Sequence, residues 1–255
     1  MTGRSSSTLT DVALPLARVM RVRVGTSGFS FDGWKRSFYP AGMRASGFLK
    51  FYASKLPTVE INNTFYKLPT EKSLAAWAAD VPDGFSFALK ASGFLTHRMK
   101  LKNPAQTIAR FWGLASLLGD KRGPVLVQLP PTMTKDLARL DAFLAELPAG
   151  HRAAIEFRHP SWFDDDVLAT LRARGAALVC SEGFGNDGTV LEGKLIATTD
   201  WGYVRLRREA YDDAMLAAWA TTIRAQPWTD AWVFIKHEDA GGGPKVAARL
   251  LEMLG

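Results

Sequence analysis

The stretch Ala154-Ile155-Glu156-Phe157-Arg158 alternates apolar and charged residues over the length of a short β-strand. Successive side chains of a strand point to opposite faces, so Ile155 and Phe157 share one face while Glu156 and Arg158 share the other. If such a strand is buried on both faces, its charged side needs a polar interior. The stretch therefore predicts a sheet that encloses polar groups.

Seven other short apolar segments also end in polar or charged residues, and most of the eight are followed by a helix-like stretch. In chain order the segments are 22–25, 59–62, 85–90, 125–128, 154–158, 177–181, 203–207 and 232–237. Eight alternations of strand and helix predict an α/β fold, a closed TIM-type (β/α)8 barrel. The chemistry of such a barrel lies at the C-terminal ends of its strands, where the charged residues of these segments fall.

The connections between the segments carry helix signals. Helices are predicted over 46–56, after Thr70, and over 103–118, 135–146, 163–174, 211–225 and 244–254, with Gly175 ending the fifth. Asn103 and Pro104 are expected as the N-cap and first residue of the third. The sixth connection, 182–200, is rich in Gly, Asn, Asp and Thr and lacks a helical stripe. It is predicted to be a long irregular loop in place of a sixth helix.

Composition limits the class of protein. A chain of 255 residues that is 47% hydrophobic can bury one large core, so residues 21–255 are expected to form a single domain, preceded by a flexible extension over 1–20. Cys180 is the only cysteine, which excludes an intramolecular disulfide. The polar start of the chain lacks a signal peptide or membrane span, so we expect a cytoplasmic protein with no membrane partner.

The alternation places a ring of polar side chains inside the upper barrel. The expected inward residues are Glu60, Asn62, Ser86, Lys90, Gln128, Glu156, Arg158, Tyr203, Arg205 and Lys236. A self-neutralised network, with each glutamate pairing an arginine, is the structural alternative. Four cations against two carboxylates leave an excess of positive charge, as does the net charge of +7 for the whole chain. An anionic partner, a small molecule or a nucleic acid, is therefore expected.

Three histidines flank this ring and suit proton transfer near neutral pH: His97, His159 and His237. His151 precedes the fifth strand at the opposite end and is interpreted as structural. Aromatic residues in the loops of the same rim are candidates to stack on a base or sugar ring, or to form a core under long loops. They are Trp34, Tyr39, Phe65, Tyr66, Trp162 and Trp201.

Two other chemistries stay open. Glu60, Glu156 and the rim histidines are possible ligands of a divalent metal, although the adjacent cations argue against it and no HxH or HExxH spacing is present. No cofactor is predicted. Lys90 or Lys236 is a candidate Schiff-base nucleophile, since neighbouring cations lower the pKa of an amine.

The chain resembles the YecE-like family, a bacterial and archaeal family of unknown function. The resemblance rests on Glu60 through Tyr66, Phe87 with Lys90, Thr96 and His97, Gln128 through Pro130, Glu156 through His159 with Ser161 and Trp162, Tyr203 through Leu206, and Phe234 with Lys236, His237 and Glu238. It implies a TIM-like barrel but no established activity. Family members often continue with His and Gly after the Arg-Leu pair, where this chain has Arg207 and Arg208, which add positive charge.

The leading hypothesis is a hydrolase-like enzyme, with a nuclease as one option, that acts on a phosphate-containing substrate such as a nucleotide, nucleic acid or sugar phosphate. Its expected catalytic residues are Glu60, Lys90, His97, Glu156 and His159, and its expected substrate-binding residues are Asn62, Gln128, Arg158, Trp162, Tyr203, Arg205, Lys236 and His237. The alternatives are a nucleic-acid-binding protein without catalysis and a Schiff-base lyase or aldolase. The sequence leaves the oligomeric state open.

Overall fold

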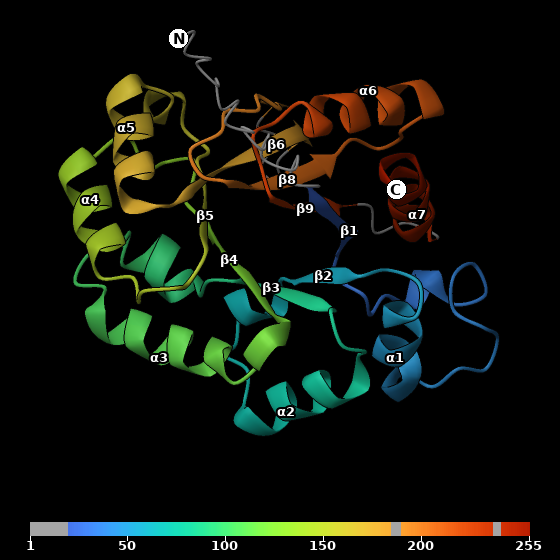
Figure 1. Ribbon diagram of the computed structural model, residues 1–255. Helices are drawn as coiled ribbons and strands as arrows, with labels where there is room; N and C mark the ends of the chain where they lie inside the picture. Colours follow the sequence, from blue (N-terminus) through green and yellow to red (C-terminus); the bar gives the residue numbers. More distant parts are fainter. Residues whose placement is uncertain (1–19, 185–189, 237–240) are drawn as a thin grey trace, which may run out of the picture.

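Eight parallel strands form a closed barrel in the computed structural model, which describes residues 20–184, 190–236 and 241–255 (Figure 1). The strands are β1 (Arg21–Ser27), β2 (Thr58–Ile61), β3 (Ser86–Lys90), β4 (Arg122–Gln128), β5 (Ala153–Glu156), β6 (Ala177–Phe184), β8 (Trp201–Arg207) and β9 (Asp230–Ile235). Each strand pairs with the next, and β9 pairs with β1 in parallel to close the ring. The predicted fold is confirmed.

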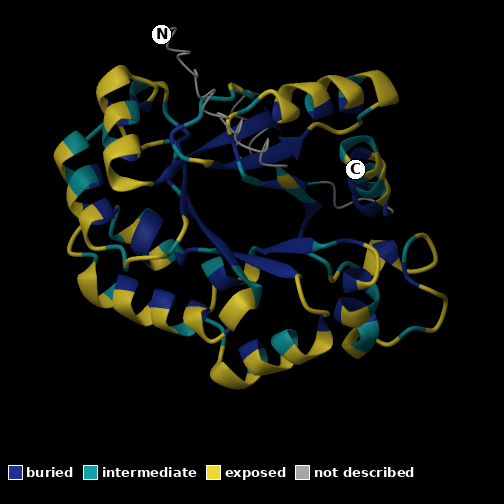
Figure 2. Cartoon of the chain, viewed as in Figure 1, coloured by how far each residue is buried: buried dark blue, intermediate teal, exposed yellow. Residues whose placement is uncertain are grey.

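Seven α-helices of the described residues surround the strands. They are α1 (Phe48–Ala53), α2 (Glu71–Asp80), α3 (Ala105–Ser116), α4 (Leu137–Ala145), α5 (Asp165–Arg174), α6 (Asp213–Arg224) and α7 (Gly242–Leu254). Short turns add η1 (Asp32–Trp34), η2 (Ala45–Gly47), η3 (Asn63–Phe65), η4 (Phe94–Arg98), η5 (Gly119–Lys121) and η6 (Pro160–Trp162). Figure 2 shows the exposed residues on the outer faces of the helices and the buried ones on the strands. No helix in the described ranges is both long and apolar enough to cross a membrane.

Local capping explains where several helices begin and end. Thr70 and Ser73 form a reciprocal capping box at the start of α2. Gly175 ends α5 in the left-handed conformation at φ 64°. The N-cap of α3 differs from the prediction by one residue, because Pro104 takes the cap position while Asn103 adopts φ 42° in the preceding turn.

The sixth connection departs from the predicted irregular loop. Strand β6 continues to Phe184 and pairs antiparallel with β7 (Val190–Glu192), so the first part of the expected loop over 182–200 belongs to a hairpin. Strand β5 pairs with β6 only at the start of β6. Strand β7 therefore supplies hydrogen-bond partners to backbone groups at the end of β6. The Glu182 side chain anchors the hairpin base, because it accepts hydrogen bonds from Arg208 and from the Tyr211 hydroxyl. Between β6 and β8 no helix occurs in the described part of the chain, as expected.

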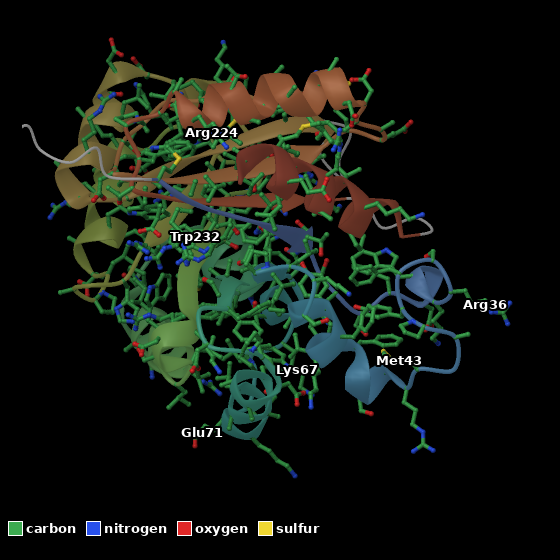
Figure 3. The ribbon with its side chains drawn as sticks, turned by 45° about the vertical axis from the view of Figure 1, so that its right-hand side comes forward. Arg36, Met43, Lys67, Glu71, Arg224 and Trp232 are labelled. Atoms are coloured by element: carbon green, nitrogen blue, oxygen red, sulfur yellow. The ribbon has the colours of Figure 1, made fainter. Side chains whose placement is uncertain are left out.

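A second, smaller apolar cluster fills the barrel itself beneath the polar ring. It consists of Ala88, Leu126, Ala154, Ala177, Val179, Trp201, Tyr203, Trp232 and Phe234. Trp232 lies among the strands in Figure 3, and its indole donates a hydrogen bond to Ser86. Trp201 begins β8 and packs edge-on against Trp232, at the end of the barrel opposite the strand C-termini. The expectation that Trp201 lies on the upper rim is therefore wrong.

The expected extension over residues 1–20 lies outside the described residues except for Met20, which packs against the core.

The closure of β1 against β2 requires a glycine. A Cβ at Gly25 would lie 2.0 Å from the Thr58 carbonyl oxygen, so we expect Gly25→Ala to lower the free energy of unfolding by at least about 1 to 3 kcal/mol. Gly113→Ala is the matched control, because Gly113 is exposed within α3 and a Cβ there meets no atom within 4 Å. That variant should gain about 0.5 to 1 kcal/mol. Urea denaturation measures both; equal effects would contradict the steric account.

Candidate functional site

A pocket of about 580 Å³ opens at the C-terminal ends of the barrel strands. Five cationic side chains line it: Lys90, Arg158, Arg205, Arg207 and Lys236. Its other polar lining residues include Ser27, Asn62, His97 and Gln128, and none of the described lining residues is acidic. The pocket therefore presents cations to a ligand without a carboxylate among them.

The two glutamates of the barrel lie beneath the pocket and are joined by one arginine. Arg205 Nη2 lies 2.8 Å from Glu60 Oε1, and Arg205 Nη1 lies 2.6 Å from Glu156 Oε2. All three side chains are at most 2% exposed. Because buried charges are tolerated only when paired and hydrogen-bonded, this bridge and the Arg158–Glu156 pair at 2.6 Å together balance the two carboxylates.

Each glutamate also accepts a hydrogen bond from the residue two positions further along the chain and from side chains of other strands. For Glu60 the donors are Ser27 Oγ at 2.7 Å, the Tyr203 hydroxyl at 2.7 Å and Asn62 Nδ2 at 3.1 Å. For Glu156 they are Arg158 Nε at 2.6 Å and Gln128 Nε2 at 2.9 Å. Gln128 in turn accepts from Lys90 Nζ at 2.9 Å. The glutamates thus fix the orientation of the residues that line the pocket.

Electrostatics keep both glutamates ionised. Burial alone raises the pKa of a carboxyl group, but attraction by Arg205 and the hydrogen bonds outweigh it and hold the pKa of Glu60 below its usual value. The pKa of Glu156 is also lowered, because attraction by Arg205, Arg158 and Arg207 outweighs the penalty of burial. Both carboxylates are thus anionic and already accept several hydrogen bonds. Such groups suit the positioning of cations rather than proton transfer.

Among the described residues that line the pocket, cations are in excess over carboxylates. Burial, followed by repulsion from Arg205, lowers the pKa of Lys90 to about 8. The same two causes lower the pKa of Arg207 to about 10. A lowered pKa means that the cationic form is destabilised. An anionic ligand stabilises that form, because its negative charge offsets the repulsion between the cations.

His97 lies in η4 and is fixed by the residue before it. Thr96 Oγ1 is 2.9 Å from His97 Nδ1 and 3.2 Å from the Ser92 carbonyl oxygen. The hydroxyl has one proton, so it donates to one of these two partners, and the contact with Thr96 holds the His97 ring in place in either tautomer. Burial, then Lys90 and Arg158, lower the pKa of His97. The lowered pKa favours the neutral imidazole, which keeps one ring nitrogen free to act as a base.

Most of the expected site residues meet in this arrangement. Seven of them line the pocket: Lys90, His97, Asn62, Gln128, Arg158, Arg205 and Lys236. Three others are buried directly beneath it: Glu60, Glu156 and Tyr203. His159 does not line it; its Nδ1 accepts a hydrogen bond from the Ser161 backbone and caps η6. Trp162 is buried and donates to the Met133 carbonyl. His237 lies outside the described residues.

The other expected rim aromatics separate into two kinds. Trp34 and Tyr39 are buried in a core under the β1–α1 loop, as the alternative interpretation has it. Phe65 and Tyr66 line the pocket. In Figure 3 Arg36, on the same β1–α1 loop, lies at the periphery of the molecule.

Three contributors were not among the expected site residues, although the sequence marks Arg207 as an added positive charge: Ser27, Thr96 and Arg207. Tyr203 and Arg205 point into the barrel, so the next residue of the same parity, Arg207, does so as well. In the first strand Ser27 has the same parity as Gly25. Both residues therefore follow from strand parity extended by one step. Thr96 lies in a turn, where no periodicity marks its role. Its contact with His97 required the folded backbone.

With respect to metals, no group of three or more His, Cys, Asp or Glu side chains in the described ranges is arranged to hold an ion.

Comparison with known proteins adds relatives. The sequence profile described as "Protein of unknown function DUF72" matches residues 23–255. The UPF0759 protein YecE of Escherichia coli (strain K12) is 31% identical over 116 residues, which is 45% of this chain and 43% of that protein. The matched region thus spans less than half of the length of that relative. The resemblance to the YecE-like family is confirmed.

Solved structures support the same assignment. A DUF72 family protein from Thermotoga maritima MSB8 superimposes with a TM-score of 0.80 at 27% identity, covering 92% of this chain and 99% of that one. D-Psicose 3-epimerase from Clostridium cellulolyticum H10, solved with D-tagatose, gives a TM-score of 0.51 at 11% identity over 92% and 96% of the two chains. The second likeness concerns the fold alone.

The Arg205 bridge predicts a pH-dependent loss of stability. Arg205→Met leaves Glu60 buried without its guanidinium partner, and we expect the variant to lose about 3 to 5 kcal/mol near neutral pH. In the wild type the lowered pKa of Glu60 makes its contribution present above the unfolded pKa. In the variant burial dominates and raises that pKa, so stability falls as pH rises and the deficit is larger at about pH 8 than at about pH 5.

Urea denaturation at the two pH values measures this difference. Arg174→Met is the control, because the Arg174–Asp141 pair is exposed to solvent and should change stability little at either pH. A deficit that stays constant with pH would show that Arg205 stabilises the barrel by packing rather than by neutralising the carboxylates.

Proposed function

We propose that this chain, which belongs to the DUF72 family of proteins of unknown function, is an enzyme acting on a phosphate-containing substrate at the mouth of its barrel. One observation carries the proposal: five cations and no acidic side chain are among the described residues that line the pocket. A phosphate group brings a charge of about −1.5 to −2 and three acceptor oxygens at neutral pH. It therefore matches both the charge and the donors of this pocket.

Preorganisation supports the same reading. Arg158 and Arg205 are fixed by Glu156 and Glu60 before any ligand arrives. Donors that are already oriented cost little entropy on binding and stabilise charge that develops during a reaction. In the proposal the arginines and Lys236 hold the phosphate, and the glutamates act as positioning residues beneath them.

The proposed reaction is phosphoester hydrolysis. His97 Nε2 takes a proton from a water whose oxygen forms the new bond to phosphorus. The bond from phosphorus to the leaving oxygen breaks, and the Lys90 ammonium gives that oxygen a proton. A pKa of about 8 lets Lys90 carry a proton at neutral pH and release it readily.

A Schiff-base lyase or aldolase is the second candidate, since the same lowered pKa leaves part of Lys90 as a neutral amine. Borohydride trapping of a carbonyl substrate on Lys90 would favour it over hydrolysis. A nucleic-acid-binding protein without turnover is distinguished by affinity that falls steeply with salt and grows with oligonucleotide length.

A reducing cytoplasm is the compartment that the cysteine usage favours. Cys180 is the only cysteine of the chain. It is buried, and burial raises the pKa of its thiol, which keeps it unreactive.

The test of an anion site is thermal unfolding at fixed ionic strength with phosphate, sugar phosphates, nucleotides, short DNA and RNA, and divalent metals. A ligand at a hundred times its dissociation constant adds about 2.7 kcal/mol, which raises Tm by several degrees in a chain of this size. We expect phosphate compounds to raise Tm of the wild type but not of Arg158→Ala. Arg249→Ala, which removes a surface cation paired with Asp213, should respond like the wild type. No shift with any phosphate compound would refute the proposal.

Anion affinity should depend on the protonation of Lys90. As pH rises through about 8 the ammonium loses its proton, so we expect the affinity for sulfate, whose own charge stays constant, to fall between about pH 7 and pH 9. Lys90→Met should bind sulfate more weakly at pH 7 and lose this pH dependence. Isothermal titration calorimetry measures both; an unchanged pH profile in the variant would assign the titration to another group.

A further inference from the structure

Tyr66 is the most exposed of the large apolar side chains that the structure describes as exposed. Its exposed fraction is 83%, against 48% to 51% for Phe94, Leu117 and Phe163. It nevertheless lines the cationic pocket. Apolar surface that is exposed to solvent gains free energy when it is buried. A ligand that covers the Tyr66 ring at the edge of the pocket can therefore supply this stabilisation.

The ring stands on a rigid base. The hydroxyl of Thr64, which is buried, lies 2.6 Å from the Lys90 carbonyl oxygen and ties η3 to strand β3. Phe65 packs against Gly93 so closely that a Cβ there would lie 2.8 Å from its ring. The rings of Phe65 and Tyr66 meet edge to face at 5.0 Å and 80°. Binding against such a base immobilises few groups that were mobile before.

Aromatic and cationic walls meet at one point of the pocket. Lys90 Nζ lies 4.4 Å from the centroid of the Phe65 ring, and the centroids of the Phe65 and His97 rings lie 4.9 Å apart in an edge-to-face arrangement. Phe29, Phe31 and Trp77 also line the pocket. A ligand that satisfies both walls carries an anionic group and, next to it, a flat apolar ring.

We propose that Phe65 and Tyr66 form a stacking subsite for the nucleobase of a nucleotide whose phosphate lies among the five cations. The inference rests on the proposed function and names its substrate class. Among phosphate-bearing ligands, nucleotides carry a flat ring that can stack on this aromatic wall. A sugar phosphate instead presents hydroxyl groups to a wall that is largely apolar. Base stacking on an aromatic side chain tolerates every base, so the subsite selects nucleotides without selecting a sequence.

The experiment compares three probes on the intact chain: inorganic phosphate, ribose 5-phosphate and adenosine 5′-monophosphate. We expect the nucleotide to bind about 5- to 150-fold more tightly than ribose 5-phosphate, as base stacking predicts. Tyr66→Ala should abolish this advantage while leaving the affinity for ribose 5-phosphate unchanged. Tyr66→Phe should retain it. Calorimetric titration gives all affinities.

Phe163→Ala is the matched control, because Phe163 is an exposed aromatic that does not line the pocket. Its nucleotide advantage should equal that of the wild type. Since Tyr66 is exposed, its variants should keep the wild-type Tm, which checks folding.

The outcomes separate the two proposals. Equal binding of nucleotide and sugar phosphate, or an equal loss of both in Tyr66→Ala, overturns the stacking subsite and leaves the anion site intact. If none of the three probes binds to the wild type, the phosphate-binding function itself is wrong and the subsite falls with it.

Discussion

The contact of Arg205 with Glu60 and Glu156 is the constraint on which the upper barrel depends. Two carboxylates buried in a strand-walled interior are tolerated because one guanidinium lies between them at 2.8 and 2.6 Å. Arg158 Nε lies 2.6 Å from Glu156 Oε1, so Arg158 and Arg205 together balance the two carboxylates. Among the described lining residues the further positive charge lies on the side that faces the pocket, where an anionic ligand can bind.

The barrel interior divides into two tiers with different tasks. Around Trp232 and Phe234 apolar side chains pack against one another and close the lower end. Above them the same strands present charged and amide groups that are hydrogen-bonded across strand boundaries, as Gln128 is to Lys90 and Glu156. The packed tier supplies stability, and the polar tier, which costs stability unless fully paired, is where binding energy is available.

Strand parity accounts for how much of the site was predictable. Glu60, Lys90, Glu156 and Arg205 were placed inside the barrel by alternation alone, and the same rule extended by one step reaches Arg207. Parity says nothing of residues in turns. His159 is a catalytic candidate in the sequence because it follows Arg158 at the rim, whereas the folded chain uses that ring to cap η6. Strand parity also does not predict which aromatic residues of the loops are exposed, because their exposure depends on what the folded loops cover.

The sequence by itself determined the eight-fold alternation, the barrel and the set of side chains that turn inward, since these follow from local periodicity of two and 3.6 residues. Tertiary structure decided which of those charges neutralise one another, which histidine keeps a free nitrogen and which aromatic rings stay exposed. The reason is separation along the chain: Glu60 and Arg205 are 145 residues apart, and only closure of the barrel brings them within hydrogen-bond distance.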